Sequence, residues 1–517
     1  MTQQKSEDCV VPEGLRKLAP TRTSTEGGKA VPVKGVGQQG LLPFATAESL
    51  RKRGTERKPR SGQPGGRIQK VPKAKVNQPP VGPAKMEEVV ERLTEALHKV
   101  VANKGAPGPD RQTVSQLAER WNQVYPWLSR SLLNGSYIPG EIRRAWIPKS
   151  DGKGERGLGI PSVVDRVVQE ATRMVLEPRY EPMFNSSSHG FRPERGCQTA
   201  IAQARKYVED GCHWVVDIDL ENFFNRVPHQ RLMAKLAEQV EDKRLLVLIH
   251  RMLKAKVVMP DGVKIATDEG LPQGGPLSPL LSNIVLNELD EELTRRGLRF
   301  VRYADDSNIY VRSERAAQRV MRSIVHFIER RLGLKVNKAK SAVASPEIRH
   351  FLGYRLASQA DGGVQVLLSE RSEKRLRERV VELTPRSRGR SLAATIKAIN
   401  VYLRGWLGHF GVCTNGIERT VGAVDAHIRR RLRAIVLKHW KTKRTIARRL
   451  VGLGVKRKTA WRRVYEGRKS IWNLSHDPAV DRGLRNAYFA ERGLVSLLEQ
   501  FKRRWTTIFV PQQLTLF

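Results

Sequence analysis

Two adjacent aspartates, Asp305 and Asp306, separate two stretches of alternating apolar residues, Leu298–Phe300 and Ile309–Val311. Alternation predicts strands, and the short span between them predicts a hairpin with both aspartates at its tip. Neighbouring carboxylates repel each other, so a sheet carries such a pair at a cost unless a cation offsets the charge. Taken alone, an Asp-Asp turn is more often a solvated loop. A metal-binding role therefore needs a third carboxylate from another strand.

A second apolar strand with acidic residues is predicted at residues 213–220. Asp217 and Asp219 lie on the same face of this strand, because side chains repeat every second residue, so parity does not separate them. Asp219 is favoured because it stands at the strand end, whereas Asp217 is otherwise an edge or salt-bridged residue. Three carboxylates from two strands form an all-oxygen site that suits Mg²⁺. Two such ions can activate a 3′-hydroxyl and stabilise a pyrophosphate leaving group.

The rest of the pattern predicts an α+β fold in which a sheet carries helices on one face. Residues 145–161 predict two short strands joined by a Gly-rich basic tip that can curl over a ligand. Helices are expected over residues 163–180, 229–253, 279–296 and 314–332, and almost everywhere beyond residue 370. An earlier helix begins at Met86 and ends before Gly105. Its buried face is expected to hold Val89, Val90, Leu93, Leu97 and Val101.

A formal net charge of +41 and a pI near 10.6 exceed what solubility requires. The expected partner is a polyanion, because the Arg and Lys clusters are mixed with aromatic residues. Residues 1–84 lack sustained periodicity and are expected to form a basic disordered arm. No run of 18 apolar residues and no signal-peptide core occur, so we expect no membrane partner and a cytoplasmic, nucleoid-associated protein. The four cysteines are far apart, which predicts neither disulfides nor a zinc knuckle.

Nine short motifs follow one another between residues 86 and 505. They are NKGAPGPD, IPKSDGKGERGLGIP, HGFRPERGCQTAI, DIDLENFF, GLPQGGPLSPLLSNIVLNELD, YADD, LGLKVNKAKS, FLGY and YLRGWLGHF. In this order they make the chain similar to the bacterial group II intron-encoded reverse transcriptases and maturases. The resemblance implies RNA-directed DNA polymerase activity, with intron RNA binding that assists splicing and mobility by target-primed reverse transcription.

The same resemblance implies a right-hand polymerase whose palm is an antiparallel sheet backed by helices. The implied regions are the arm (1–84), the fingers (85–205), the palm (206–368), a helical thumb and maturase region (369–450) and a basic nucleic-acid-binding region (451–517). The implied partners are group II intron RNA, an RNA template with a DNA primer or target DNA, and dNTPs. The oligomeric state stays open.

Carried over residue by residue, the resemblance implies that Asp219, Asp305 and Asp306 bind two magnesium ions, with the carbonyl of Leu220 as a further ligand. Lys340 is the implied general acid that protonates pyrophosphate, or else a surface lysine.

The incoming nucleotide has its own implied residues. Lys149 and Arg156 match the fingers cations that hold the triphosphate, and Lys153 rivals Lys149. Two cations on a mobile tip can close over phosphates, although a solvated basic loop would have the same composition. Phe224 matches the ring that excludes a ribose 2′-hydroxyl, unless Phe223 is the gate. Gln273 matches the residue beside the sugar and the template base, and its neighbouring glycines permit close backbone approach to a ligand.

The segment from Ala426 to Lys469 contains seventeen Arg and Lys residues against one acid, Glu466. Charge of this density favours a surface that binds phosphate. Its aromatic residues can stack on bases, but burial is the more common fate of tryptophans such as Trp440 and Trp461. The expected nucleic-acid-binding residues are Arg429, Arg430, Arg431, Arg433, Lys441, Arg448, Arg449, Lys456, Arg457 and Lys458.

Two departures from the family pattern stand out. Asn225 replaces an aspartate that many members carry and that is not expected to bind metal. No Cys- and His-containing nuclease domain is expected, because the last Cys is Cys413 and the last His is His476. Two rival hypotheses are a domesticated or defence-linked reverse transcriptase outside an intron and a polymerase-silent RNA-binding splicing factor. The three aspartates, the fingers cations and the PQGG string disfavour the second of these.

Overall fold

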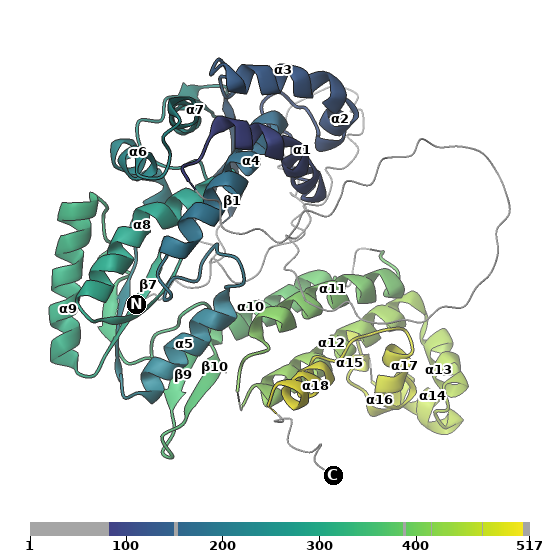
Figure 1. The fold of residues 1–517 in the computed structure, drawn as a ribbon. Helices are drawn as coiled ribbons and strands as arrows, with labels where there is room; N and C mark the ends of the chain where they lie inside the picture. The colour runs from purple at the N-terminus through teal and green to yellow at the C-terminus, as the bar shows by residue number, and fades with distance from the viewer. Residues whose placement is uncertain (1–81, 149–153, 386–388, 415, 468, 510–517) are drawn as a thin grey trace, which may run out of the picture.

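The computed structural model describes residues 82–148, 154–385, 389–414, 416–467 and 469–509 (Figure 1). The expected basic arm therefore lies outside the described residues up to residue 81. Its last residues are ordered against the protein: Ala84 is fully buried, and its N–H donates to the carbonyl of Gln239 at 3.2 Å. The first helix, α1, follows directly.

The first part of the chain contains four helices and a small sheet. The helices are α1 (Met86–Ala102), α2 (Val114–Glu119), α3 (Trp121–Leu133) and α4 (Val163–Tyr180). Strands β1 (Ile142–Pro148) and β2 (Glu155–Ile160) form the expected hairpin, in a sheet of order β2-β1-β4-β5 with β4 (Val257–Val258) and β5 (Lys264–Ile265). The buried face of α1 includes Val89, Leu93 and Leu97 as expected, but Val100 rather than Val101 is buried and Val90 is only partly so.

The prediction of a single helix over residues 229–253 is wrong. Two helices replace it, α6 (His229–Ala237) and α7 (Lys243–Leu253). The break serves Asp242, whose carboxylate caps α7 by accepting from the N–H of Arg244 and also accepts from the N–H of Met86 at 2.9 Å. The Arg244 side chain is the main reason that the pKa of Asp242 falls to about 2. The apolar periodicity of both helices gave no sign of this cap.

The second sheet has the strand order β6-β7-β3-β8 and is antiparallel. Its strands are β3 (Trp214–Ile218), β6 (Arg299–Tyr303), β7 (Asp306–Val311) and β8 (Ala342–Ala344). One face, with Val216 and Ile309, joins a core with α8 (Ser278–Arg295) and α9 (Glu314–Phe327). The other face, with Val215 and Tyr310, joins a second core with α5 (Cys197–Glu209). The prediction that helices cover only one face of the sheet is therefore wrong, since α5 covers the other face.

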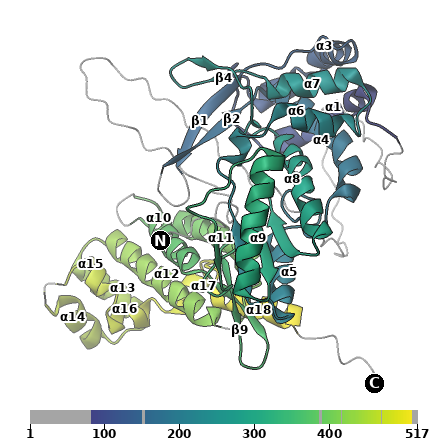
Figure 2. The same cartoon turned by 90° about the vertical axis from the view of Figure 1, so that its left-hand side faces the viewer.

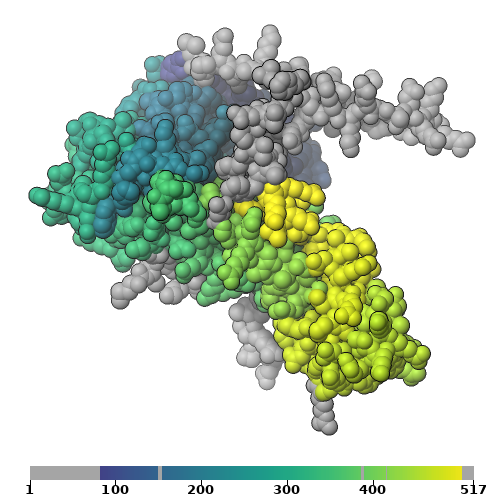
Figure 3. All heavy atoms as spheres, turned by 90° about the horizontal axis from the view of Figure 1, so that it is seen from below, coloured from purple at the N-terminus to yellow at the C-terminus, as the bar shows by residue number. Residues whose placement is uncertain are grey.

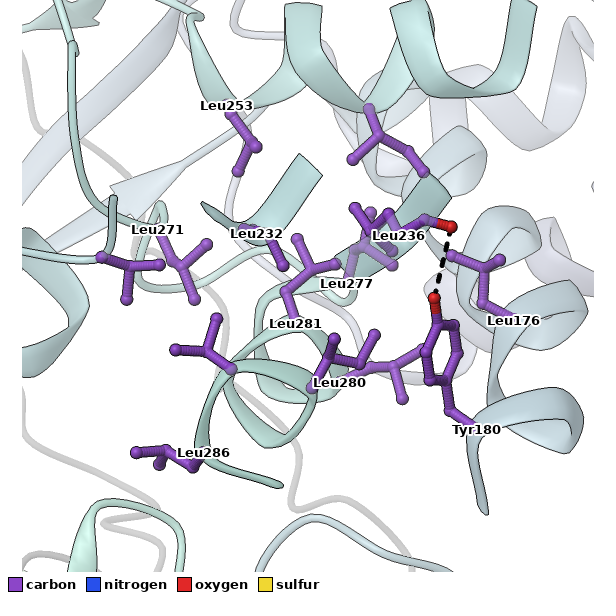
Figure 4. Packing of buried hydrophobic residues seen from close by; sticks show 14 of the residues in the cluster. Leu176, Tyr180, Leu232, Leu236, Leu253, Leu271, Leu277, Leu280, Leu281 and Leu286 are labelled. Atoms are coloured by element: carbon purple, nitrogen blue, oxygen red, sulfur yellow. Dashed lines mark hydrogen bonds between the residues drawn. The ribbon is translucent and has the colours of Figure 1, made fainter. Parts of the chain in front are cut away.

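The two cores are built from different parts of the chain. The first unites α1, α4, α6, α7, α8 and α9 with one face of this sheet. Figure 4 shows its centre, where Leu280 and Leu281 of α8 lie near Leu236 and the Tyr180 hydroxyl donates to the Leu236 carbonyl at 3.5 Å. The second core joins the opposite face to everything that follows β8.

That C-terminal part begins with a hairpin of β9 (Tyr354–Ser358) and β10 (Val364–Leu368) and continues as helices only. Figures 2 and 3 show the helices as a lobe beside the rest of the protein. They are α10 (Glu370–Leu383), α11 (Leu392–Phe410), α12 (Ile417–His439), α13 (Lys443–Gly452), α14 (Arg457–Tyr465), α15 (Ile471–Leu474), α16 (Pro478–Gly483), α17 (Asn486–Ala490) and α18 (Leu497–Phe509). In the described part of the chain, no helix is both long and apolar enough to cross a membrane.

Two expected region boundaries fall inside helices. The boundary between residues 205 and 206 cuts α5, which packs as one unit on the β6-β7-β3-β8 sheet. The boundary between residues 450 and 451 cuts α13. The change from strand to helix between Leu368 and Glu370 does coincide with the expected start of the helical region.

Candidate active site

Asp305 lies in a two-residue hairpin turn, and Asp306 is the first residue of the strand that follows it. Tyr303 pairs with Asp306 across the ends of β6 and β7, so Ala304 and Asp305 form the turn itself. Ala304 has φ +55° and is buried, a backbone conformation that an alanine adopts only where its surroundings impose it. The carbonyl of Ala304 accepts a hydrogen bond from Arg302 at 2.9 Å. The surrounding protein therefore fixes the backbone that carries both carboxylates.

Asp219 lies beside this turn. The antiparallel register pairs Asp217 with Asn308 and Ile218 with Ser307, so the next position places Asp219 opposite Asp306. Both side chains therefore project from the same face, because directly opposed residues share a face. The backbone of Asp219 is held on its other edge: its carbonyl accepts from Asn337 at 2.7 Å, and its N–H donates to the Ser341 hydroxyl at 2.9 Å.

Asp217, which parity could not distinguish from Asp219, has a structural partner. Its carboxylate forms a buried ion pair with Arg349, whose Nε donates at 3.0 Å. Arg349 also donates to the carbonyl of Lys340 at 2.8 Å, which ties the 337–341 segment to the sheet. A carboxylate with a buried arginine partner is already neutralised, so Asp219 is the better candidate for metal binding.

Lys340 lies beside Asp219. Its Nζ is 4.0 Å from Oδ2 of Asp219, and its side chain is partly exposed. A lysine at the edge of a carboxylate site retains contact with solvent and can reach a leaving group there. The structure therefore places Lys340 at the same strand end as Asp219, and its role as a general acid stays a prediction.

The donor set of this turn and strand end is hard oxygen only: three carboxylates and the carbonyl of Leu220, whose residue bridges to Val336. Such donors fit magnesium. Within the described ranges, however, no three Asp, Glu, His or Cys side chains converge closely enough to form a ready-made metal site. Like charges repel, so a bound cation would favour the approach of these carboxylates to one another.

The fingers hairpin reaches the PQGG loop. Arg156 on β2 donates from Nε to Oε1 of Gln273 at 2.9 Å, and the N–H of Gly159 donates to the Gln273 carbonyl at 2.6 Å. Two expected nucleotide-binding residues therefore touch each other. Lys149 and its rival Lys153 lie outside the described residues.

The two glycines of PQGG are closely surrounded by other parts of the protein. A Cβ on Gly274, which has φ +125°, would lie 2.4 Å from the Gly159 carbonyl oxygen. A Cβ on Gly275 would lie 2.2 Å from Oε1 of Gln169 on α4. Both glycines therefore make room for the protein's own strand β2 and helix α4, and their role in ligand approach stays a prediction.

Phe223 and Phe224 belong to a short 3₁₀ turn, Phe223–Asn225, which lies a few residues after Asp219 and the end of β3. Both rings are buried, and their centroids are 5.2 Å apart in an edge-to-face contact. The Phe224 carbonyl accepts from the N–H of Leu271, just before the PQGG glycines. The turn therefore connects the end of β3 with the Gln273 loop, and the choice between the two rings stays open.

The expected nucleic-acid-binding residues divide into surface and interior residues. Arg429 is half-buried, and seven others are exposed: Arg430, Lys441, Arg448, Arg449, Lys456, Arg457 and Lys458. Arg431 and Arg433 were expected on this surface and are instead buried. Arg431 donates to the Thr384 hydroxyl and carbonyl, and Arg433 donates to the Leu484 carbonyl and pairs with Asp481. Protein groups hold both guanidinium groups, so neither belongs to a phosphate-binding surface.

Several residues at the site were not found from the sequence. Asn337, Ser341 and Arg349 fix the segment beside Asp219, and Arg302 fixes the turn. The strings NKAKS and FVRYADD contained three of them. Only Lys340 was singled out in the first string and only Asp305 and Asp306 in the second, since nothing in a linear pattern indicates which polar side chain turns inward.

Two family comparisons match successive parts of the chain. Residues 147–356 match the reverse transcriptase (RNA-dependent DNA polymerase) family, and residues 373–451 match the group II intron maturase-specific domain. Protein YkfC of Escherichia coli K12 is 33% identical over 354 residues, which cover 60% of this chain and 88% of YkfC. The chain belongs to the group II intron reverse transcriptases and maturases. It is thus an RNA-directed DNA polymerase with a role in intron splicing.

Other members of this family match over shorter stretches. The group II intron-encoded protein LtrA of Lactococcus lactis is 39% identical over 173 residues, 34% of this chain and 28% of LtrA. Nuclear intron maturase 4 of Arabidopsis thaliana is 34% identical over 150 residues, 28% of this chain and 18% of that protein. This chain therefore matches less than a third of the length of either protein. A solved structure titled "Partial Cas6-RT-Cas1--Cas2 complex" aligns at 22% identity with a TM-score of 0.32, over 48% of this chain and 43% of that one.

Proposed function

We propose that Asp219, Asp305 and Asp306, with the carbonyl of Leu220, bind two magnesium ions and form the polymerase centre of this reverse transcriptase. The observation that carries the proposal is the register that sets Asp219 opposite Asp306, beside Asp305 in the turn. When bound, the ions would activate a primer 3′-hydroxyl and stabilise charge on the leaving pyrophosphate.

The surrounding residues have separate roles in this proposal. Lys340, 4.0 Å from Asp219, gives a proton to the departing pyrophosphate. Lys149 and Arg156 bind the triphosphate, and Arg156 exchanges its hydrogen bond with Gln273 for one with a phosphate oxygen. Gln273 then faces the sugar and the template base. Phe224 closes the space that a ribose 2′-hydroxyl would need.

The test is a pair of matched substitutions on one strand. Asp219→Asn should abolish primer extension on an RNA template while primer-template binding stays close to wild type, because the loss falls on transition-state stabilisation. Asp217→Asn should lower thermal stability, because it weakens the buried pair with Arg349, yet retain extension. The reverse result, with Asp217→Asn inactive and Asp219→Asn active, would move the metal site to Asp217.

We propose further that the exposed basic residues of α12 to α14 bind group II intron RNA, and that the same protein copies this RNA by target-primed reverse transcription during retrohoming. Support comes from the exposure of seven cations on three successive helices and the segments that connect them. The test supplies intron RNA with a nicked target duplex and measures cDNA joined to the target strand. Product should form with the wild type and not with Asp306→Ala; equal product from both would exclude this activity.

A further inference from the structure

A fully buried ion pair lies directly behind the Asp305-Asp306 turn. Arg302 of β6 and Asp290 of α8 each have no exposed surface. Nε of Arg302 donates to Oδ1 of Asp290 at 2.8 Å, and Nη2 donates to Oδ2 at 2.6 Å. This two-pronged geometry fixes the orientation of the guanidinium group as well as its charge.

The remaining guanidinium nitrogen contacts the turn itself. Nη1 of Arg302 donates to the Ala304 carbonyl at 2.9 Å and to Oδ1 of Asn283 at 3.0 Å. Asn283 in turn donates from Nδ2 to the Gly190 carbonyl at 2.9 Å. Asn283 and Asp290 are seven residues apart on α8 and therefore share one face of that helix.

Gly190 closes the turn from a second side. A Cβ built on it would lie 2.2 Å from the backbone nitrogen of Ala304, so only a glycine permits this approach. The segment before it pairs with β6: the Arg302 N–H donates to the Ser187 carbonyl and the His189 N–H to the Arg302 carbonyl, both at 2.9 Å. The backbone of the turn is thus held by α8 through Arg302 and by the 187–190 segment.

The Arg302 side chain does not lie with the candidate metal ligands. Arg302 pairs with Ser307, whereas Asp306 pairs with Tyr303, so Arg302 projects from the opposite face of the sheet to Asp306. The hydrogen bond from Arg302 to the Ala304 carbonyl links the ion pair to the backbone that carries the carboxylates.

We propose that Arg302, Asp290 and Asn283 are positioning residues that set the placement of the Asp305 and Asp306 carboxylates, and thereby the magnesium requirement of the polymerase. This inference rests on the proposed metal-binding role of those aspartates. Stability alone does not explain the ion pair, since well-packed apolar residues often replace a buried pair without loss of stability. An apolar pair could not donate a hydrogen bond to the carbonyl of Ala304. In the protein, this hydrogen bond stabilises the positive-φ conformation of the turn.

The experiment measures single-turnover primer extension across a magnesium titration. Arg302→Lys keeps the charge but loses the fork, and Arg302→Met with Asp290→Leu removes both charges together. We expect the extension rate to fall about 10²-fold, as for a misplaced catalytic group, and the magnesium midpoint to rise. The burst amplitude, which counts competent enzyme, and the primer-template affinity should stay at the wild-type values.

A matched control is Arg173→Lys on α4, which disturbs a partly buried ion pair with Glu170 and Glu177 outside the site. It should keep the wild-type rate and magnesium midpoint. The inference is overturned if the Arg302 variants keep the wild-type rate and magnesium midpoint. It is also overturned if only the burst amplitude falls, or if neither variant folds. Asp306→Ala separates the two proposals: if it still extends primers, the metal assignment fails, and if it is inactive while Arg302→Lys is normal, only the positioning role fails.

Discussion

Asp217 and Asp219 are two residues apart at the end of β3, but their surroundings in the folded protein differ. Asp217 is paired with Arg349, which is 132 residues away in the sequence, whereas Asp219 stands opposite Asp306 at the strand end. The alternation of the strand predicted that both share a face. It could not predict the arginine, because the partner of a buried charge comes from wherever the fold returns the chain.

At the same scale, we expect substitutions of the adjacent residues Phe223 and Phe224 to have different effects on the choice between dNTPs and rNTPs. Phe224→Ala should lower the preference for dNTPs over rNTPs by about 10²-fold, because we propose that this ring closes the space that a 2′-hydroxyl would need. Phe223→Ala is the matched control and should lower stability through loss of packing, since the ring is buried. The measurement is the ratio of kcat/KM for the two nucleotide types. A change confined to Phe223→Ala would transfer the gate to that residue.

Arg156 offers a second residue-scale prediction, for triphosphate binding. Arg156→Ala removes a charge-assisted hydrogen bond of about 1.5–3 kcal/mol, so KM for dNTPs should rise by about one to two orders of magnitude. Glu155→Ala is the control, because Glu155 is the exposed neighbour on the same strand. Steady-state extension at varied dNTP concentration gives both values. An unchanged KM for Arg156→Ala would leave the triphosphate to other cations.

At the scale of elements, helix α12 shows where sequence reasoning failed. Its arginines at 429–431 and 433 read as one basic cluster, but the helix is packed on several sides, so Arg431 and Arg433 turn inward to backbone carbonyls. Charge density along a sequence does not reveal how many faces of a helix are covered. In contrast, the bounds of the hairpin at residues 299–311 and of helix α4 were predicted closely, although both elements are buried on more than one side.

The exposed cations of α13 and α14 give an element-scale prediction that separates splicing from synthesis. Replacing Arg448, Arg449, Arg457 and Lys458 by Gln should weaken intron RNA binding and reduce the salt slope of log affinity by about 0.7 for each lost phosphate contact. Extension of a saturating primer on an unrelated RNA template should change far less. Binding titrations at several salt concentrations, beside extension assays, provide the check.

The control for this experiment is Arg433, which was predicted to bind nucleic acid but is buried. Arg433→Gln should lower thermal stability, because Arg433 is buried between Leu484 and Asp481, without lowering the salt slope. Equal loss of binding and extension in the surface variant would instead mark α13 and α14 as part of the primer grip.

At the scale of the whole molecule, buried histidines make stability depend on pH. Burial is the largest cause that lowers the pKa of His189, His350 and His409 to about 4. An unfolded histidine has a pKa near 6.5, so between about pH 4 and 6.5 the unfolded chain binds more protons. The free energy of unfolding should therefore be highest above about pH 6.5 and fall as the pH drops toward 4, by at most about 1.4 kcal/mol per pH unit and histidine.

His409→Phe tests this dependence at one site. The ring of His409 stacks on Tyr354 at 5.6 Å between centroids, and phenylalanine keeps that contact while removing the titrating group. Urea unfolding between pH 5 and 8 should show a smaller slope below pH 6.5 for the variant, with parallel curves at pH 7 to 8. Identical slopes across the whole range would show that His409 does not contribute.

The division into two cores also has a consequence for synthesis of the protein on the ribosome. The first core is complete once residue 343 has emerged, but the second core draws on residues from Cys197 to Phe501. Until the last helices arrive, this second core lacks their apolar side chains, so residues that precede them lack partners such as Phe410, which contacts Tyr354. Nascent chains with uncovered apolar surface are prone to aggregate and to bind chaperones. The second core should therefore form late, since most of its buried residues belong to the part of the chain that is translated last.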